Sequence, residues 1–189
     1  YDDPSMGPAD PAELYRNDDG AWTDISASLP QEAHDGYTFS SGFYDANGDR
    51  RPELFIGNDF GKIRPSVLLW NDGDGNFTAD LNWHPGWEDM GMGVADLNGD
   101  LQPDFLMSSW KSVSLVVSGD ALGIPGTWVN DLSIVADPEN RNQVYGWGSA
   151  FGDVANDSDL DAVVLFGYWS TYDNPGDPDV QVDGLWLQG

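Results

Sequence analysis

The chain alternates short apolar runs with clusters of Gly, Asn and Asp. The runs at 37–44 and 53–58 flank one such cluster, and those at 67–71 and 76–80 flank another. Short runs rich in aromatic and branched side chains, bounded by turn residues, are typical of β-strands. No apolar stripe with a 3.6-residue period extends over a dozen residues. The pattern therefore predicts an all-β chain of short antiparallel strands.

The predicted strands recur as a repeated unit. GFYDANGDRRPELFIGN, GVADLNGDLQPDFLMSS and AFGDVANDSDLDAVVLF align without gaps, and their acidic loops begin at Asp45, Asp96 and Asp153. A second element, LYRNDDGAWTDIS at 14–26, resembles LLWNDGDGNFTADL at 68–81. A unit of four short strands repeated about every 50 residues is the signature of a β-propeller blade.

The repeat predicts a single domain over residues 1–189, an all-β propeller segment of about three to three and a half four-stranded blades. Propellers usually close with about 4–8 blades. We therefore expect the segment to belong to a larger propeller, whose remaining blades come from the rest of the chain. The expected units cover approximately 37–88, 89–144 and 145–189, with 13–26 as the tail of a preceding blade.

The charge of the chain restricts its partners. There are 33 acidic residues against 7 basic ones, a formal net charge of -26, although 40% of the residues are hydrophobic. So negative a chain is not expected to bind nucleic acid or anionic membranes, because both need basic patches. The absence of Cys excludes disulfides and thiolate metal sites. No apolar run reaches the roughly 18 residues of a membrane span, and we expect any export signal to lie outside this sequence.

The first acidic loop, DANGDRRPE, carries oxygen-bearing side chains at positions 1, 3, 5 and 9. Calcium takes six to eight oxygen ligands from carboxylates, amides and carbonyls at about 2.3–2.6 Å. Gly48 at position 4 allows the chain to turn inside such a ligand cage. The candidate ligands are the side chains of Asp45, Asn47, Asp49 and Glu53 and the main-chain carbonyl of Arg51.

The second loop repeats the spacing, and the third departs from it at one position. The second offers the side chains of Asp96, Asn98, Asp100 and Asp104 and the carbonyl of Gln102. The third has Ala155 at position 3, so one side-chain ligand is missing, and Asn156 or the side chain of Asp159 is left to compensate. We expect a weaker or empty third site, with candidate ligands Asp153, Asp157, Asp161 and the carbonyl of Asp159.

These loops have other interpretations. Asp, Asn and Gly are ordinary turn residues, so each loop alone is compatible with an unliganded hairpin. Two full matches in register favour Ca²⁺, with Mg²⁺ and Mn²⁺ as alternatives. An EF-hand is disfavoured, because the twelfth loop positions are Ile56, Met107 and Val164 rather than Glu. The stretches NDDG at 17–20 and DGDG at 72–75 lack a common ligand spacing, and we expect both to be hairpin turns.

The stretches DANGDRRPELFIGN and DLNGDLQPDFLMSS resemble FG-GAP/VCBS repeats, the blades of integrin-α-type β-propellers. LYRNDDGAWTDIS and MGVADLNGDLQPDFLMSS are more specifically similar to the secreted ASPIC/UnbV-type relatives. The resemblance covers nearly the whole chain after about residue 13. It implies a seven-bladed propeller and structural Ca²⁺ held between the first and second strands of a blade.

The sequence and the resemblance together predict a non-catalytic, calcium-stabilised recognition or scaffold module of an exported protein. The expected location is extracellular, periplasmic or the cell surface, and the ligand, a protein or a glycan, is not identified. The alternative is a carbohydrate-active propeller (polysaccharide lyase or hydrolase) or a lectin. Its candidate sugar-stacking residues are Trp87, Trp110, Trp147 and Trp169.

Core packing is the expected role for most of the nine tryptophans. Trp147 aligns with Phe39 and Met90, each six residues before an acidic loop, which favours a core position there. The two histidines, His34 and His84, are expected in surface loops.

Overall fold

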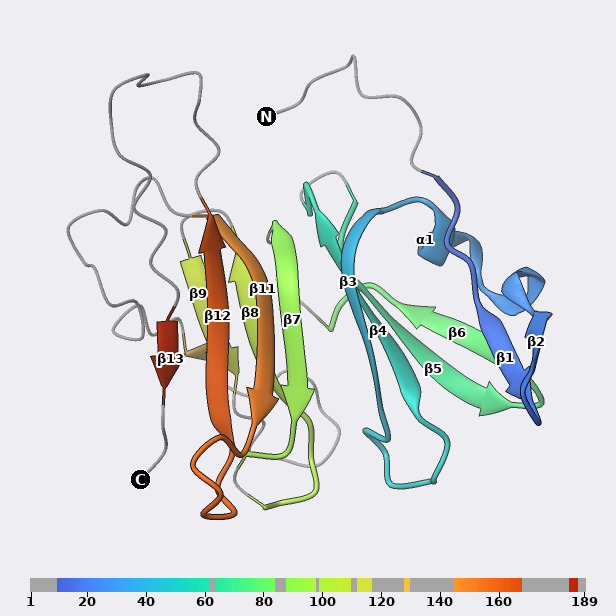
Figure 1. The fold of residues 1–189 in the computed structure, drawn as a ribbon. Helices are drawn as coiled ribbons and strands as arrows, with labels where there is room; N and C mark the ends of the chain where they lie inside the picture. The colour runs from blue at the N-terminus through green and yellow to red at the C-terminus, as the bar shows by residue number, and fades with distance from the viewer. Residues whose placement is uncertain are drawn as a thin grey trace.

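The computed structural model describes residues 10–61, 64–83, 88–97, 99–109, 112–116, 128–129, 145–167 and 184–186. These residues form small antiparallel sheets (Figure 1). The described helical segments are the short turns η1 (Ser26–Ser28) and α1 (Gln31–His34). The predicted all-β class is therefore confirmed.

The chain enters the structure through a two-stranded hairpin. β1 (Tyr15–Asp18) pairs with β2 (Ala21–Asp24). Asp19 and Gly20 join the strands with positive φ angles of 53° and 95°, the conformation that a two-residue hairpin loop requires. The predicted hairpin turn is confirmed.

The next four strands form the first complete sheet, in the order β3-β4-β5-β6. The second predicted hairpin turn joins its last two strands, with positive φ at Asp74 and Gly75. β4 is buried along its whole length and β5 over its first three residues, so this sheet has a continuous core. Its strands lie within two residues of the predicted runs: β3 (Tyr37–Tyr44), β4 (Glu53–Asp59), β5 (Val67–Gly73) and β6 (Asn76–Asp80).

Two further sheets repeat this order. The second runs β7-β8-β9-β10, with β7 (Asp89–Ala95), β8 (Asp104–Ser109), β9 (Ser112–Val116) and β10 (Trp128–Val129). The third runs β11-β12-β13, with β11 (Tyr145–Gly152), β12 (Asp161–Gly167) and β13 (Gly184–Trp186). Each sheet begins with a strand, an acidic loop and an antiparallel second strand.

The first strands of the three sheets lie next to one another, β3 against β7 and β7 against β11 (Figure 1). The ring centroids of Phe39 on β3 and Trp147 on β11 are 6.4 Å apart, which brings the first and third sheets together as well. Sheets whose first strands converge in this way have the arrangement of propeller blades.

Each first strand also carries a β-bulge at the same place. The pairing register shifts at Phe39, Met90 and Trp147, the three aligned positions six residues before the acidic loops. Met90 is buried and Trp147 is partly buried, but Phe39 is 51% exposed. The expected core role is therefore wrong for Phe39. A bulge leaves one residue outside the regular alternation of the strand, so its burial depends on what lies beside it.

An aromatic cluster fills the space between the first and second sheets. Phe55, Trp83 and Phe105 are buried, with ring centroids 4.9–5.4 Å apart. The indole N–H of Trp83 donates to the carbonyl of Ser66 at 3.1 Å, so its polar atom is satisfied inside the core. Trp22 on β2 is 68% exposed, so it is not one of the core tryptophans.

The sheets approach so closely that some positions exclude even a methyl group. A Cβ on Gly91 of β7 would lie 2.6 Å from the Cα of Gly148 on β11. A Cβ on Gly146 would similarly meet Ser108 of β8. Backbone therefore rests directly on backbone between the second and third sheets.

A buried carboxyl group lies where the first and second sheets meet. The Ser66 hydroxyl donates to Asp89 at 2.6 Å, and the Asn58 N–H donates to the Ser66 hydroxyl at 3.0 Å. Asp89 is fully buried. Burial raises the pKa of Asp89 from 3.8 to about 7, with the Ser66 hydroxyl lowering the pKa and the nearby Asp59 carboxylate raising it.

We expect Gly91→Ala to destabilise the protein, because the new methyl group meets the backbone of Gly148. Overpacking of this kind costs roughly 1–3 kcal/mol. The matched control is Gly152→Ala on β11, where a Cβ would meet nothing within 4 Å and the backbone needs no positive φ. Urea denaturation of the two variants measures the difference, and equal effects would contradict the close approach.

We expect Asp89→Asn to remove a pH dependence of stability between about pH 4 and pH 7. The folded-state pKa of Asp89 is raised, so over this window the unfolded chain releases a proton that the folded chain keeps. Wild-type stability should therefore fall as pH rises, then level off above about pH 7. Urea denaturation of both proteins at fixed calcium gives the difference curve. A flat difference curve would contradict the buried titration.

Candidate functional site

The three acidic loops connect the first and second strands of their sheets and lie at the same end of the molecule, the lower end in Figure 1. Tyr44, which directly precedes the first loop, also lies beside the second. Its pKa is raised first by burial and then by the carboxylates of Asp96, Asp104, Asp100 and Asp45. The carboxylates of the first and second loops therefore both act on the Tyr44 side chain.

In all three loops, the carboxylate at position 1 accepts the backbone N–H of position 6. The donor–acceptor distances are 2.9 Å, 2.9 Å and 3.0 Å for Arg50 to Asp45, Leu101 to Asp96 and Ser158 to Asp153. In the second and third loops the same carboxylate also accepts the N–H of position 5. Each loop is therefore folded around the carboxylate at its position 1.

The carboxylates at positions 5 and 9 also accept backbone N–H groups of their own loop. The carboxylate at position 5 accepts the N–H of position 7, with Asp49, Asp100 and Asp157 as acceptors at 2.8–3.1 Å. The carboxylate at position 9 accepts the N–H of position 2 at 2.6–2.8 Å and is at most 1% exposed; these residues are Glu53, Asp104 and Asp161.

This pattern of hydrogen bonds requires left-handed backbone at two positions in each loop. Position 4 has φ of 73°, 75° and 57° at Gly48, Gly99 and Asn156. Position 6 has φ of 70°, 67° and 78°, although it holds the non-glycine residues Arg50, Leu101 and Ser158. The sequence indicated the role of position 4 through its glycines. It gave no signal for position 6, because these side chains disfavour a positive φ.

Burial and neighbouring carboxylates act together on Glu53 in the first loop. Its pKa is raised first by burial and further by the carboxylates of Asp49 and Asp45, while the Ala46 N–H opposes the shift. Asp49 has a cationic partner, since the Arg51 guanidinium lies 2.6 Å from its second oxygen and lowers the pKa of Asp49. Both side chains of this pair are partly solvent-exposed, so the pair contributes little stability.

The first loop has the donor chemistry for a hard cation. One oxygen of Asp45 is bonded to the Arg50 N–H, and the other, Oδ1, is buried without a hydrogen-bond partner. Asp49 and Glu53 likewise use one oxygen on the backbone. The carboxylates do not converge, however: among the described residues, no three Asp, Glu or His side chains form a ready metal cluster. Binding an ion would require Asp49 to turn from Arg51 towards Asp45.

The second and third loops also carry acidic residues at positions 1, 5 and 9. Asn98 of the second loop lies outside the described residues. In the third loop, Asn156 takes the left-handed place of the glycines, and the Ala155 N–H donates to Asp161 at 3.1 Å. In the first loop, position 3 holds Asn47, whose side-chain Nδ2 donates to the Glu53 carboxylate at 3.4 Å. The ligand assignments, including the carbonyls of Arg51, Gln102 and Asp159, stay predictions.

Several other candidates lie outside the described residues: Trp87, Trp110, Trp169 and His84. His34 ends the short helix α1 and is partly buried, not a freely exposed loop residue. Within the described parts of the chain, no helix is long and apolar enough to span a membrane.

We expect Leu101→Gly to stabilise the second loop. Leu101 is 76% exposed and holds a φ of 67°, so glycine relieves strain without removing buried surface. The gain should be up to about 1 kcal/mol, since the greater chain entropy of glycine offsets part of the relief. Leu101→Ala is the control, because it keeps the Cβ and the strain. Urea denaturation at fixed calcium compares the variants, and an equal gain from alanine would exclude this explanation.

A comparison with protein families matches residues 45–107 to the FG-GAP-like repeat. The matched stretch begins at the first acidic loop and ends in β8, so it contains both loops with the full oxygen pattern. A search of curated proteins found no match. The resemblance to FG-GAP repeats is confirmed over these residues, which lie in propeller-type β-sheets.

Proposed function

We propose that the chain is a calcium-stabilised β-propeller module that acts in recognition or scaffolding and performs no catalysis itself. The observation that supports the proposal is the hydrogen-bond pattern that the three acidic loops share. In each loop, three carboxylates are held by backbone N–H groups at positions 1, 5 and 9. Repetition of one carboxylate geometry in three sheets favours a common ligand over three independent turns.

In the first loop, the side chains of Asp45, Asn47, Asp49 and Glu53 and the carbonyl of Arg51 would hold the ion. The bound cation would neutralise carboxylates that now raise the pKa of Glu53. Since Glu53 begins β4 and Asp45 directly follows β3, the ion would fasten the two strands at their shared end. The second loop would do the same for β7 and β8.

The cellular setting follows from the same chemistry. Extracellular calcium modules bind with dissociation constants of about 10⁻⁴–10⁻³ M, so they are filled only where calcium is millimolar. We therefore propose an extracellular, periplasmic or cell-surface protein. A net charge of -26 suits such a calcium-rich setting and disfavours nucleic acid as a partner. In propellers, ligands bind to the variable loops, so the protein or glycan ligand remains to be identified experimentally.

We expect millimolar Ca²⁺ to raise the thermal unfolding temperature above its value in EGTA. Calcium at about 10 mM is at least roughly 10 times a dissociation constant of 10⁻⁴–10⁻³ M and adds about 1.4 kcal/mol of stability per site. For the two loops with the full oxygen pattern together, this corresponds to a rise of roughly 5 °C or more in a domain of this size. Differential scanning calorimetry measures the shift, and identical curves in EGTA and calcium would refute the proposal.

Variants in the loops identify the site. Asp49→Ala should remove the calcium gain of the first loop, whereas Asp157→Ala should cost less because the third loop lacks a side-chain ligand at position 3. Asp72→Ala controls for net charge, since Asp72 accepts the Thr78 hydroxyl in a hairpin and lies outside the acidic loops. A gain that is lost equally in all three variants would indicate general charge screening instead of bound calcium.

A further inference from the structure

The side chain of Arg51 lies between the first acidic loop and the turn that joins β5 to β6. Its Nη2 lies 2.6 Å from Oδ2 of Asp49, and its Nε donates to the same oxygen at 3.2 Å. The pKa of Arg51 is raised first by its hydrogen bond to Asp49, then by the charge of Asp49, and further by the carboxylates of Asp72 and Asp74. The guanidinium is therefore attracted by carboxylates of the loop and by carboxylates of the turn.

The turn leaves room for this side chain. A Cβ on Gly73 would lie 2.9 Å from Nη1 of Arg51 and 3.5 Å from its Cδ, so only a glycine admits the guanidinium without a shift. The Asn71 side chain donates to the carbonyl of Pro52, the residue after Arg51, at 3.1 Å. These two contacts hold the tip of the β5–β6 hairpin against the first loop.

The first loop differs from the other two in this respect. Position 7 holds Arg51 in the first loop but Gln102 in the second and Asp159 in the third. In all three loops the N–H of position 7 donates to one oxygen of the position-5 carboxylate. The guanidinium on the second oxygen of Asp49 is therefore an addition to a pattern that the loops otherwise share.

This guanidinium and a cation held by the first loop need the same carboxylate. Asp49 must turn from Arg51 towards Asp45 before the two carboxylates can share an ion, and a guanidinium that stays beside them repels a second positive charge. The side chain of Arg51 is 51% exposed, so it can move without disturbing the core. The turn offers it another partner in Asp74, which directly follows Gly73, whereas Asp72 already accepts the Thr78 hydroxyl at 2.7 Å.

From this geometry we infer that Arg51 lowers the calcium affinity of the first loop, because its guanidinium competes with the ion for Asp49. When the loop takes up calcium, the guanidinium leaves Asp49 and pairs with Asp74. The inference rests on the proposed calcium site and adds the side chain that regulates its occupancy. In the absence of calcium, the same side chain offsets the repulsion among the loop carboxylates.

The opposite role, in which Arg51 holds Asp49 ready for the ion, fits the contacts less well. Both oxygens of Asp49 are engaged, Oδ1 by the Arg51 N–H and Oδ2 by the guanidinium. A side chain that prepared the site would bring Asp49 towards the buried Oδ1 of Asp45, yet among the described residues no three acidic side chains converge. The guanidinium thus holds Asp49 outside a shared ligand set.

Calcium titrations of the full chain, followed by NMR at the amides of Gly48 and Gly99, report on the first and second loops separately. We expect Arg51→Gln to lower the dissociation constant at Gly48 by roughly 3- to 10-fold, because an exposed ion pair and a like charge are removed together. The value at Gly99 should stay within about 2-fold, since a more distant charge is screened by salt. In EGTA the variant should unfold at a slightly lower temperature, because Asp49 loses its partner.

The matched control is Arg50→Gln, which removes the same charge at the neighbouring position. The Arg50 side chain is exposed, and no ion pair to another described residue is found for it. We expect this variant to change the dissociation constant at Gly48 by less than about 2-fold. An equal gain from the two arginine variants would show that net charge, not competition for Asp49, determines the affinity.

A double-mutant cycle tests the part played by the turn. Asp74→Asn should raise the dissociation constant at Gly48 by roughly 2- to 3-fold in the wild type and leave it unchanged in Arg51→Gln, because Asp74 acts through Arg51. Asparagine tolerates the φ of 51° at this position. Equal effects of Asp74→Asn in both backgrounds would refute the transfer of the guanidinium to Asp74.

The outcomes separate this inference from the calcium site on which it rests. A response at Gly48 that is equal or weaker in Arg51→Gln than in the wild type would overturn the inference alone, and so would an equal gain at Gly99. If neither amide responds to calcium in any variant, the proposed calcium site fails and the inference fails with it.

Discussion

The close approach of neighbouring first strands is the constraint on which the rest of the structure depends. Gly91 and Gly148 bring β7 and β11 together at a distance that no side chain permits, and Gly42 and Gly93 receive Val94 and Phe151 in successive interfaces. With the strands this close, polar groups between sheets must be satisfied locally. Ser149 bonds the Leu106 carbonyl, and Ser66 bonds Asp89. The small residues therefore determine both the spacing of the sheets and the polar contacts that join them.

The acidic loops lie at the ends of these tightly packed strands, so their positions are determined by the sheets. Each position-9 carboxylate is the first residue of a buried second strand and is nearly inaccessible to water. Backbone N–H groups stabilise these carboxylates, but in the first loop burial, and further the carboxylates of Asp49 and Asp45, still raise the pKa of Glu53. Arg51 supplies a charge partner to Asp49 from the loop surface. The second and third loops contain no basic residue in their sequences.

Much of the fold could be predicted, because strand boundaries depend on local chemistry. β3 and β6 begin and end at the predicted residues, and the Asp-Gly turns form the expected hairpins. Three features could not be predicted. The left-handed Leu101 is imposed by its N–H bond to Asp96, against its own preference. The buried Asp89 depends on contacts with residues of the preceding sheet. The exposure of Phe39 depends on a bulge and on its neighbours in space.

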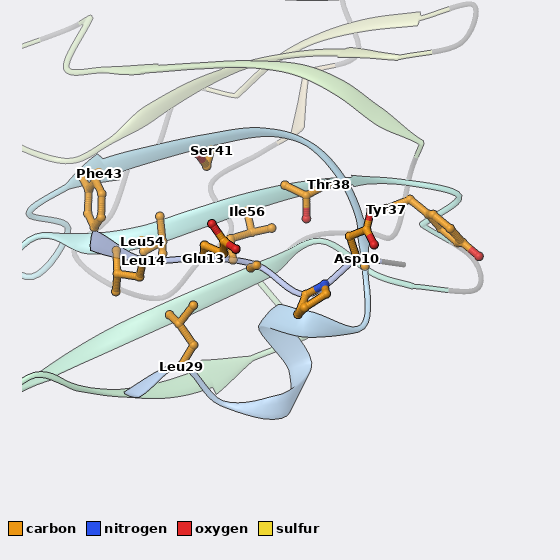
Figure 2. Close-up of a pocket in the computed structure, with 13 residues that line it drawn as sticks. Asp10, Glu13, Leu14, Leu29, Tyr37, Thr38, Ser41, Phe43, Leu54 and Ile56 are labelled. Carbon is orange, nitrogen blue, oxygen red and sulfur yellow. The ribbon is translucent and has the colours of Figure 1, made fainter. Parts of the chain in front are cut away.

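Phe43 and Phe151 show most clearly that the burial of a side chain depends on contacts outside its own strand. They are the same residue type at the same position of the repeat, yet Phe43 is largely exposed and Phe151 is packed against Gly93. The strand sequence alone cannot produce this difference, so it reflects a preceding hairpin that, among the described residues, is present only for Phe151. Ser41 and Ser149 differ in the same way, since Ser149 donates to the Leu106 carbonyl and Ser41 borders the open cavity between β3, β4 and the segment leading into β1 (Figure 2). The difference is therefore not confined to one side chain. A repeat unit in this protein therefore carries half of each interface, and its side chains acquire their roles only when the unit before it is in place.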